Sequence, residues 1–198
     1  MSAPARYLLA AQVGFLTLLA SCAVVDPAGL ESNHGWSYYE GRNATVVPYV
    51  LAFAVFVVLT LYAAALLERS RGPDGFATGL RYLCVFLLLD LATPDTLNTF
   101  FYWAHDVTSA ALFVYELAFA AWLVVVVAPT RPAVVLLAAQ FGGGLVAMFS
   151  QLQLVPLLGA GILLFQLSFG LVLVAAAARV EVWDETALDE VRAAVADR

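Results

Sequence analysis

Long apolar blocks separated by short polar connections dominate this chain, and they restrict its fold more than any other feature. The blocks are about 17 to 25 residues long, which is the length that an α-helix rising about 1.5 Å per residue needs to cross a hydrocarbon layer of about 30 Å. Hydrophobic residues make up 63% of the chain, charged residues make up 12%, and the mean hydropathy is +0.90. These values exclude an ordinary soluble domain. The sequence therefore predicts an all-α, polytopic transmembrane bundle.

Six membrane spans are predicted from the apolar blocks. They are Tyr7 to Val25, Val46 to Leu67, Phe76 to Thr93, Ala104 to Ala128, Ala133 to Ser150 and Leu157 to Val180. The last two belong to one apolar run from Ala133 to Val180, which would measure about 70 Å as a single helix and must therefore turn back once. We expect the turn at Gln151, Gln153 and Pro156, because proline disfavours helix at the residue before it.

Arginine positions predict how the bundle is oriented. The chain contains no lysine, which excludes a retinal-type Schiff base. If the spans alternate in direction, eight of the nine arginines lie on one side of the membrane and only Arg42 lies on the other. The positive-inside rule then places both termini in the cytoplasm of a multi-pass protein of the cell membrane.

Two domains of unequal size are expected. Residues 1–182 form the six-helix transmembrane domain, and residues 183–198 form a short acidic cytoplasmic tail helix with Asp184 as its N-cap. The formal net charge is −6, and no basic cluster is dense enough to bind nucleic acid. We expect membrane lipids as partners, together with a small or lipid-like ligand and a second copy or partner subunit.

The two cysteines are predicted to be unpaired. Cys22 falls near the outer end of the first span and Cys84 in the inner half of the third, so they are too far apart for a disulfide. Residues Leu19 to Cys22 also resemble the lipobox of bacterial lipoproteins, in which the chain is cleaved before an acylated cysteine. Cleavage would remove the first span, and both alternatives remain open at this point.

The first outer loop carries a family resemblance. The run Gly35-Trp36-Ser37-Tyr38-Tyr39-Glu40-Gly41, the run Thr45 to Tyr49 that opens the second span, and His105 to Ala110 at the head of the fourth form its pattern. Together they resemble small six-helix prokaryotic membrane proteins of unknown function, which are distantly similar to the FRAG/DRAM-type family. The resemblance implies a six-helix topology and a prokaryotic source, and it implies no catalytic residues.

The fourth span carries ionisable groups that lipid does not tolerate. His105, Ser109, Leu112 and Glu116 lie along one helical stripe, in which Leu112 is an apolar break, and Asp106 lies beside it. His105 falls near the headgroups, whereas Glu116 lies about 16 Å deeper. Because an ionised carboxylate facing lipid costs a few kcal/mol or more, Glu116 should face the bundle. We expect a neutral Glu116 that bonds Gln12, Gln140 or Gln166, either as part of a ligand site or as a packing contact between helices.

A second polar group is predicted at the outer end of the third and fourth spans. It contains Asp90, Asp95, Asn98, His105 and Asp106. One imidazole among carboxylates does not match the spacing of known metal motifs, so we predict neither a metal nor a cofactor.

Three functional classes follow from these residues. The first is a protein that binds or translocates a small or lipid-like ligand, in a proton-linked manner, through an outward-facing polar pocket on the fourth span. Its ligand-binding residues would be Glu116, Ser109, His105, Asp106, Asp90, Asp95 and Asn98. The second is a membrane-embedded enzyme that uses a neutral carboxyl of Glu116, Asp106 or Asp90 as general acid on a lipid or isoprenoid substrate. The third is an accessory subunit of a membrane complex.

Overall fold

The computed structural model describes residues 1 to 196 except Glu31, Asn33, Arg71, Gly72 and Thr96, and it describes side chains as far as Val180. Within these residues every regular element is helical, as the sequence predicts. The six long helices are α1 (Ala3–Val25), α2 (Val46–Leu67), α3 (Phe76–Leu91), α4 (Thr99–Trp122), α5 (Arg131–Gln151) and α6 (Leu158–Ala196). Two short 3₁₀ helices, η1 (Pro27–Leu30) and η2 (Gly35–Tyr39), fold the first connection, and a π-helical turn, η3 (Leu123–Val127), follows α4.

Five of the six helices have the length and apolar composition needed to cross a membrane. They are α1, α2, α4 with η3, α5 and α6 up to Val180, and they identify an integral, multi-pass membrane protein. The third, α3, has 16 residues and ends at Leu91 instead of the predicted Thr93. Its end is fixed by Thr93, whose hydroxyl donates to the carbonyl oxygens of Leu89 and Asp90 at 3.0 Å, and by Pro94, which disfavours helix before it.

Several helices begin at side-chain caps that were not evident from the apolar pattern alone. Ser2 accepts a hydrogen bond from the Ala5 amide at 3.3 Å, so α1 starts four residues before the predicted Tyr7. Asn98 accepts from the amides of Phe100 and Phe101 at 3.0 and 3.2 Å, so α4 starts five residues before the predicted Ala104. Each cap satisfies backbone donors that have no partner inside the helix.

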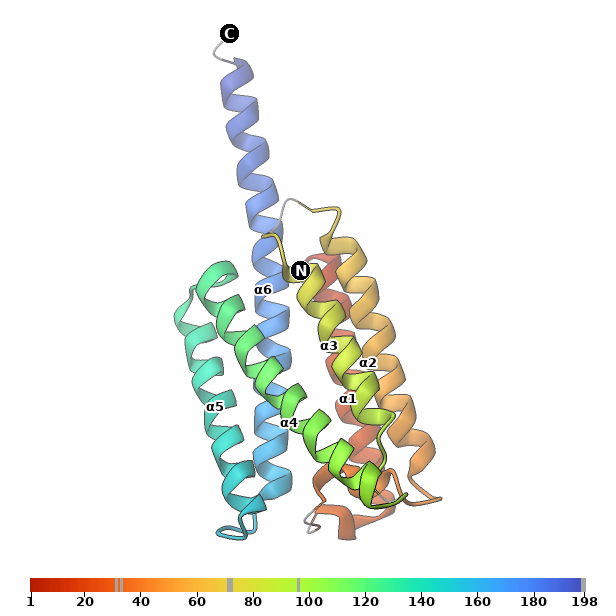
Figure 1. The fold of residues 1–198 in the computed structure, drawn as a ribbon. Coiled ribbons are helices and arrows are strands. Elements are labelled where there is room, and N and C mark those ends of the chain that lie inside the picture. Colours follow the sequence, from red (N-terminus) through yellow and green to blue (C-terminus); the bar gives the residue numbers. More distant parts are fainter. Residues whose placement is uncertain (31, 33, 71–72, 96, 197–198) are drawn as a thin grey trace.

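The helices form two groups that α4 connects (Figure 1). In one group α2 packs between α1 and α3, and in the other α5 packs along α6. Helix α6 also contacts α1, and α4 runs obliquely across the bundle from α3 towards α5 and α6. The start of α1 and the end of α6 point towards the same end of the bundle (Figure 1).

Glycine allows α5 and α6 to approach closely. A Cβ atom on Gly143 would lie 2.7 Å from the Phe165 amide nitrogen, and one on Gly161 would lie 2.5 Å from the Ala147 amide nitrogen. Both contacts are with backbone, which cannot move aside cheaply. Small residues at such crossings are characteristic of helix packing in membranes.

The reversal between α5 and α6 lies where the sequence predicts it. Helix α5 ends at Gln151, and Gln153 adopts a left-handed backbone conformation with φ of 58°. Helix α6 then continues to Ala196 without a separate start near Asp184, so the predicted tail helix is continuous with the last span. The Asp184 side chain itself lies outside the described residues.

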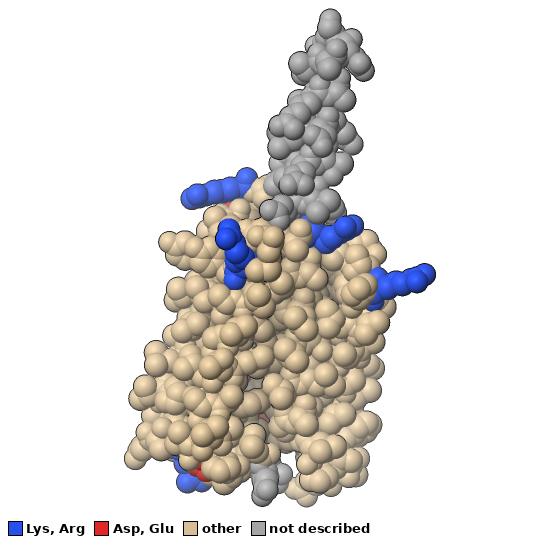
Figure 2. All heavy atoms as spheres, turned by 180° about the vertical axis from the view of Figure 1, so that it is seen from behind, with Lys and Arg blue, Asp and Glu red and all other residues tan. Residues whose placement is uncertain are grey.

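Most arginine side chains that the structure describes belong to one end of the bundle. They are Arg6 in the first turns of α1, Arg69 after α2, Arg81 in α3, Arg131 at the start of α5 and Arg179 in α6. Figure 2 shows this gathering of basic side chains at the upper end of the view. Arg81 forms an ion pair with Glu68 there. The arrangement matches the charge pattern from which a cytoplasmic position of both termini is predicted.

Both cysteines are free and buried, which confirms that they are unpaired. The Cys22 thiol donates to the Thr45 carbonyl oxygen at 3.6 Å and the Cys84 thiol to the Val57 carbonyl oxygen at 3.8 Å. Helix α1 supplies core residues such as Phe15, which a chain cleaved before Cys22 would lack.

Candidate functional site

Glu116 lies inside the bundle, near the middle of α4. The residue is only 1% exposed, and its Oε2 accepts a hydrogen bond from Gln166 Nε2 of α6 at 2.9 Å. Gln12 of α1 donates to the backbone oxygen of Gln166 at 3.0 Å, so three helices meet at this point. The prediction that Glu116 faces inward is confirmed, and Gln166 is the partner among the three glutamines considered. Gln140 is buried elsewhere in α5.

A second polar cluster joins α3, α4 and η2 nearer the end of the bundle opposite the start of α1, which is the predicted outer end. Ser109 donates to Asp90 Oδ1 at 2.5 Å, and Thr108 donates to the same oxygen at 3.5 Å. His105 Nε2 lies 2.7 Å from Ser37 Oγ and 3.3 Å from Ser109 Oγ, while its Nδ1 lies 3.8 Å from Asp90 Oδ1. Asp90 and His105 are both buried. Of the predicted outer group, Asp90 and His105 lie together in this cluster, and Ser109 of the predicted stripe on the fourth span joins them.

The remaining predicted residues lie at the outer rim or outside the site. Asp95 Oδ2 lies 3.0 Å from His34 Nδ1, and Asp106 is exposed on α4. Asn98 caps the first turn of α4 through its side-chain oxygen, and it is not part of the cavity wall. Its place in the predicted site is therefore not supported.

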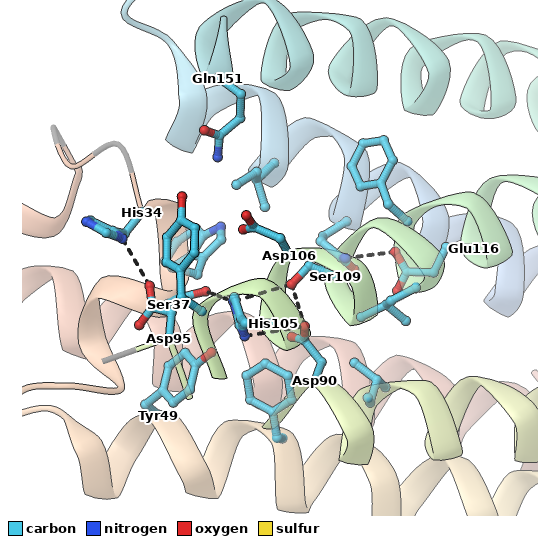
Figure 3. A pocket seen from close by; sticks show the side chains of 18 of the residues that line it. His34, Ser37, Tyr49, Asp90, Asp95, His105, Asp106, Ser109, Glu116 and Gln151 are labelled. Atoms are coloured by element: carbon cyan, nitrogen blue, oxygen red, sulfur yellow. Dashed lines mark hydrogen bonds and ion pairs between the residues drawn. The ribbon is translucent and has the colours of Figure 1, made fainter. Parts of the chain in front are cut away.

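One cavity of about 500 Å³ lies between the helices (Figure 3). Its wall includes Asp90, Asp95, His105, Asp106, Ser109 and Glu116. All six long helices and the η2 segment contribute to its wall. Figure 3 shows Ser37, His105, Ser109 and Asp90 linked by contacts in the middle of the cavity, with Glu116 farther along α4 and His34 with Asp95 at the other end. The volume is within the range of small-molecule sites, which is about 300 to 1,000 Å³.

An apolar groove of about 650 Å³ adjoins this cavity on the side of α4, α5 and α6. The two hollows share six wall residues, which are Tyr102, Asp106, Ser109, Phe113, Gln151 and Ile162. The groove continues along Val114 and Phe141, which are 67% and 53% exposed. Because these apolar side chains face outward from a membrane protein, the groove lies open to lipid.

The cavity wall carries more acidic than basic groups. Four carboxyl groups line it, from Asp90, Asp95, Asp106 and Glu116, together with the imidazoles of His34 and His105. No arginine occurs among the described lining residues. Arg42 lies beside a neighbouring outer depression, where its guanidinium stacks over the Tyr38 ring at 4.6 Å from the centroid.

Glu40 lies in the outer loop next to this acidic group. Burial raises the pKa of Glu40 to about 7, the charge of His105 opposes this shift, and the charges of Asp95 and Asp90 add to it. Its Oε2 is buried and has no hydrogen-bond partner in the described structure. A carboxyl group of this kind holds a proton more readily than an exposed glutamate.

Sequence reasoning missed Ser37, Trp36 and Tyr49 as parts of one wall with His105. Ser37 and His105 are 68 positions apart and meet only because η2 folds back over the bundle. The outer-loop run that contains Ser37 was the available signal, but it indicated a topology and not a contact.

The contacts define what the site can do chemically. Within the described residues, no group of three or more His, Cys, Asp or Glu side chains is placed to hold a metal ion. Ser37, His105 and Asp90 follow the order of a hydroxyl, an imidazole and a carboxyl, although the 3.8 Å separation of His105 and Asp90 is longer than a hydrogen bond. The wall therefore combines proton-transfer groups with hydrogen-bond partners for a polar ligand.

Comparisons with protein-family models, with curated proteins and with solved structures give no match for this chain. The fold defines its class directly as a small all-α integral membrane protein. The site adds a polar cavity that adjoins an apolar groove.

Proposed function

We propose that this membrane protein binds a small or lipid-like ligand in the cavity beside α4, with access from the outer half of the bundle. The observation that carries the proposal is the cavity of about 500 Å³, whose wall carries carboxyl, imidazole, hydroxyl and amide groups. Each buried polar group without a partner costs about 1 to 3 kcal/mol. A contact that only joined two helices would not need an open volume of this size.

Unpaired polar atoms at the cavity support ligand binding over packing alone. His105 Nδ1 and Asp95 Oδ1 are buried and have no hydrogen-bond partner in the described structure. Both residues line the cavity. A polar ligand would supply the missing donor and acceptor.

The inner half of the bundle favours binding over translocation. Beyond Glu116 the core contains Ala120, Leu123 and Phe169, all of which are fully buried. Close apolar packing of this kind leaves the cavity open towards one end, as in a binding site. Translocation would require these side chains to separate.

Native mass spectrometry tests the proposal. Protein extracted from membranes in a mild detergent is expected to retain an added mass that a cavity-filling Ile162→Trp variant loses. Ile162 lines the cavity, whereas the adjacent Leu163 is 43% exposed and serves as the matched control Leu163→Trp. The same adduct on both variants, or no adduct on the wild-type protein, would contradict the proposal.

A second function, acyl-ester hydrolysis or transfer, is favoured by one contact. Ser37 Oγ lies 2.7 Å from His105 Nε2, within the range for a nucleophile and its general base. A serine-reactive fluorophosphonate probe would label wild-type protein and a Ser109→Ala variant but not Ser37→Ala. Absence of labelling in all three would remove this candidate and leave ligand binding as the proposed function.

A further inference from the structure

The charge and shape of the two adjoining hollows identify a ligand class. We propose that the ligand is a cationic amphiphile, whose organic ammonium group lies among the outer carboxyl groups while its apolar chain lies in the groove between α4 and α5. This inference rests on the proposed function, because it specifies the occupant of the same site.

The wall of the cavity is acidic at its outer part. Asp95 and Asp106 stand at the outer part of the cavity, and no arginine occurs among its described lining residues. Asp95 Oδ2 is paired with His34 Nδ1 at 3.0 Å, and Asp95 shares the neighbouring depression with Arg42, so the Oδ1 atom of Asp95 and the carboxyl group of Asp106 are the groups left for a ligand. The Asp95 side chain is only 7% exposed, and its Oδ1 accepts no hydrogen bond. A buried acceptor of this kind lacks a donor, which an ammonium group provides. A phosphate or carboxylate ligand would instead add negative charge to the wall.

Aromatic rings complete the environment that an ammonium group prefers. Trp36, Tyr49 and Tyr102 line the same cavity from η2, α2 and α4. The face of an aromatic ring attracts a cation, and carboxylates combined with such rings are a common means of binding substituted ammonium groups. The wall offers both kinds of group at its outer end.

The apolar groove gives the ligand's chain a path out of the cavity. Asp106 and Phe113 belong to the wall of both hollows, so a ligand can extend from one into the other. The groove follows α4 from Tyr102 to Leu117, which corresponds to roughly 22 Å along a helix and exceeds half of a hydrocarbon layer of about 30 Å. An amphiphile in the outer leaflet would therefore enter sideways, between α4 and α5.

Calorimetry on the purified protein in nanodiscs of uncharged lipid tests the ligand class, with empty nanodiscs as the blank. Dodecylammonium, whose N–H groups can donate to Asp95, is expected to bind, whereas dodecanoate and dodecanol are not. Asp106→Asn should weaken the binding of the ammonium probe roughly tenfold. Asp74→Asn, which changes an exposed carboxylate at the opposite end, should leave binding unchanged.

The outcomes separate this inference from the proposed function. Binding of dodecanoate or dodecanol in preference to the ammonium probe would overturn the cationic class and leave a ligand-binding cavity in place. Equal effects of Asp106→Asn and Asp74→Asn would also overturn it. If none of the three probes binds and the extracted protein carries no added mass, the binding function itself is rejected.

A second pair of variants tests the groove. Ala110 lines the groove, whereas the adjacent exposed Ala111 does not. Ala110→Trp should weaken the binding of dodecylammonium roughly tenfold without affecting the binding of methylammonium, and Ala111→Trp should change neither. Unchanged binding of the long probe to Ala110→Trp would contradict the proposed path of the chain.

Discussion

At the scale of single residues, Glu116 shows why an acidic side chain can persist in an apolar helix. Its carboxyl group accepts a hydrogen bond from Gln166 and is withdrawn from lipid. The direction of this side chain could be predicted from its depth and from the cost of exposing a carboxylate to hydrocarbon. Its partner could not be selected, because Gln12, Gln140 and Gln166 all fall on apolar helices whose rotation the sequence leaves open.

The Glu116→Gln variant separates a binding role from a packing role. The new amide oxygen can accept the same hydrogen bond from Gln166, so we expect the unfolding free energy to change by less than about 1 kcal/mol. Ligand retention and its dependence on pH should change, because the titratable group is gone. Melting curves together with native mass spectra at two pH values provide the measurement.

The control for this variant is Gln166→Leu, which leaves the carboxyl group without its donor and should cost about 1 to 3 kcal/mol. If Glu116→Gln lowers the melting temperature as much as Gln166→Leu and leaves ligand retention unchanged, Glu116 serves only to pack the helices.

The buried carboxyl group of Glu40 in the outer loop should make the stability of the protein depend on pH. Burial raises its pKa from 4.5 to about 7, so the folded protein favours the protonated form. The stability that depends on this proton is therefore fully present below about pH 4.5 and is lost as the pH rises through about 7. Over this pH interval, the melting temperature of the wild type should fall relative to that of Glu40→Gln. A wild-type protein that gains stability relative to Glu40→Gln as the pH rises would show the opposite sign.

At the scale of the elements, apolar periodicity predicted which segments are helical, and the second span from Val46 to Leu67 has the predicted bounds. Helix ends depend on local hydrogen bonds, which explains the errors elsewhere. The predicted fourth span continues to Ala128, but its last turn is π-helical, and the Ala128 amide donates to the Leu123 carbonyl oxygen at 2.9 Å. Hydropathy carries no information about such a turn.

Adjacent glycines in α5 provide a matched test of the helix packing. A Cβ on Gly143 would press on the backbone of α6, so Gly143→Ala should destabilise the protein by about 1 to 3 kcal/mol. Gly142 has nothing within 4 Å of the same position, so Gly142→Ala should be neutral or stabilising by up to about 1 kcal/mol. Thermal melting of both variants in detergent checks the difference. Equal melting temperatures would mean that α5 and α6 do not pack at this distance.

At the scale of the whole molecule, the number of helices and their alternating directions were predictable, but the shape of the cavity was not. The wall requires η2 to fold inward and α4 to cross obliquely, and neither follows from hydropathy. The contact between Ser37 and His105 depends on both. Most of the polar residues of the site could therefore be predicted from the sequence, but the cavity that they enclose could not.

The predicted orientation of the molecule is tested by cysteine labelling. In a background with Cys22 and Cys84 replaced by alanine, Asn43→Cys marks the outer loop and Asp74→Cys marks the connection between α2 and α3. A membrane-impermeant maleimide should label Asn43→Cys in intact cells and Asp74→Cys only after permeabilisation. The reverse pattern would place both termini outside the cytoplasm.

An electron-microscopy structure in lipid nanodiscs, with a bound antibody fragment to add mass, tests the central claim most directly. We predict an elongated density whose polar end lies between Asp95 and Asp106 and whose apolar end follows the groove along α4. A Glu116 side chain directed at the lipid, or a cavity filled by the protein's own side chains, would contradict the account.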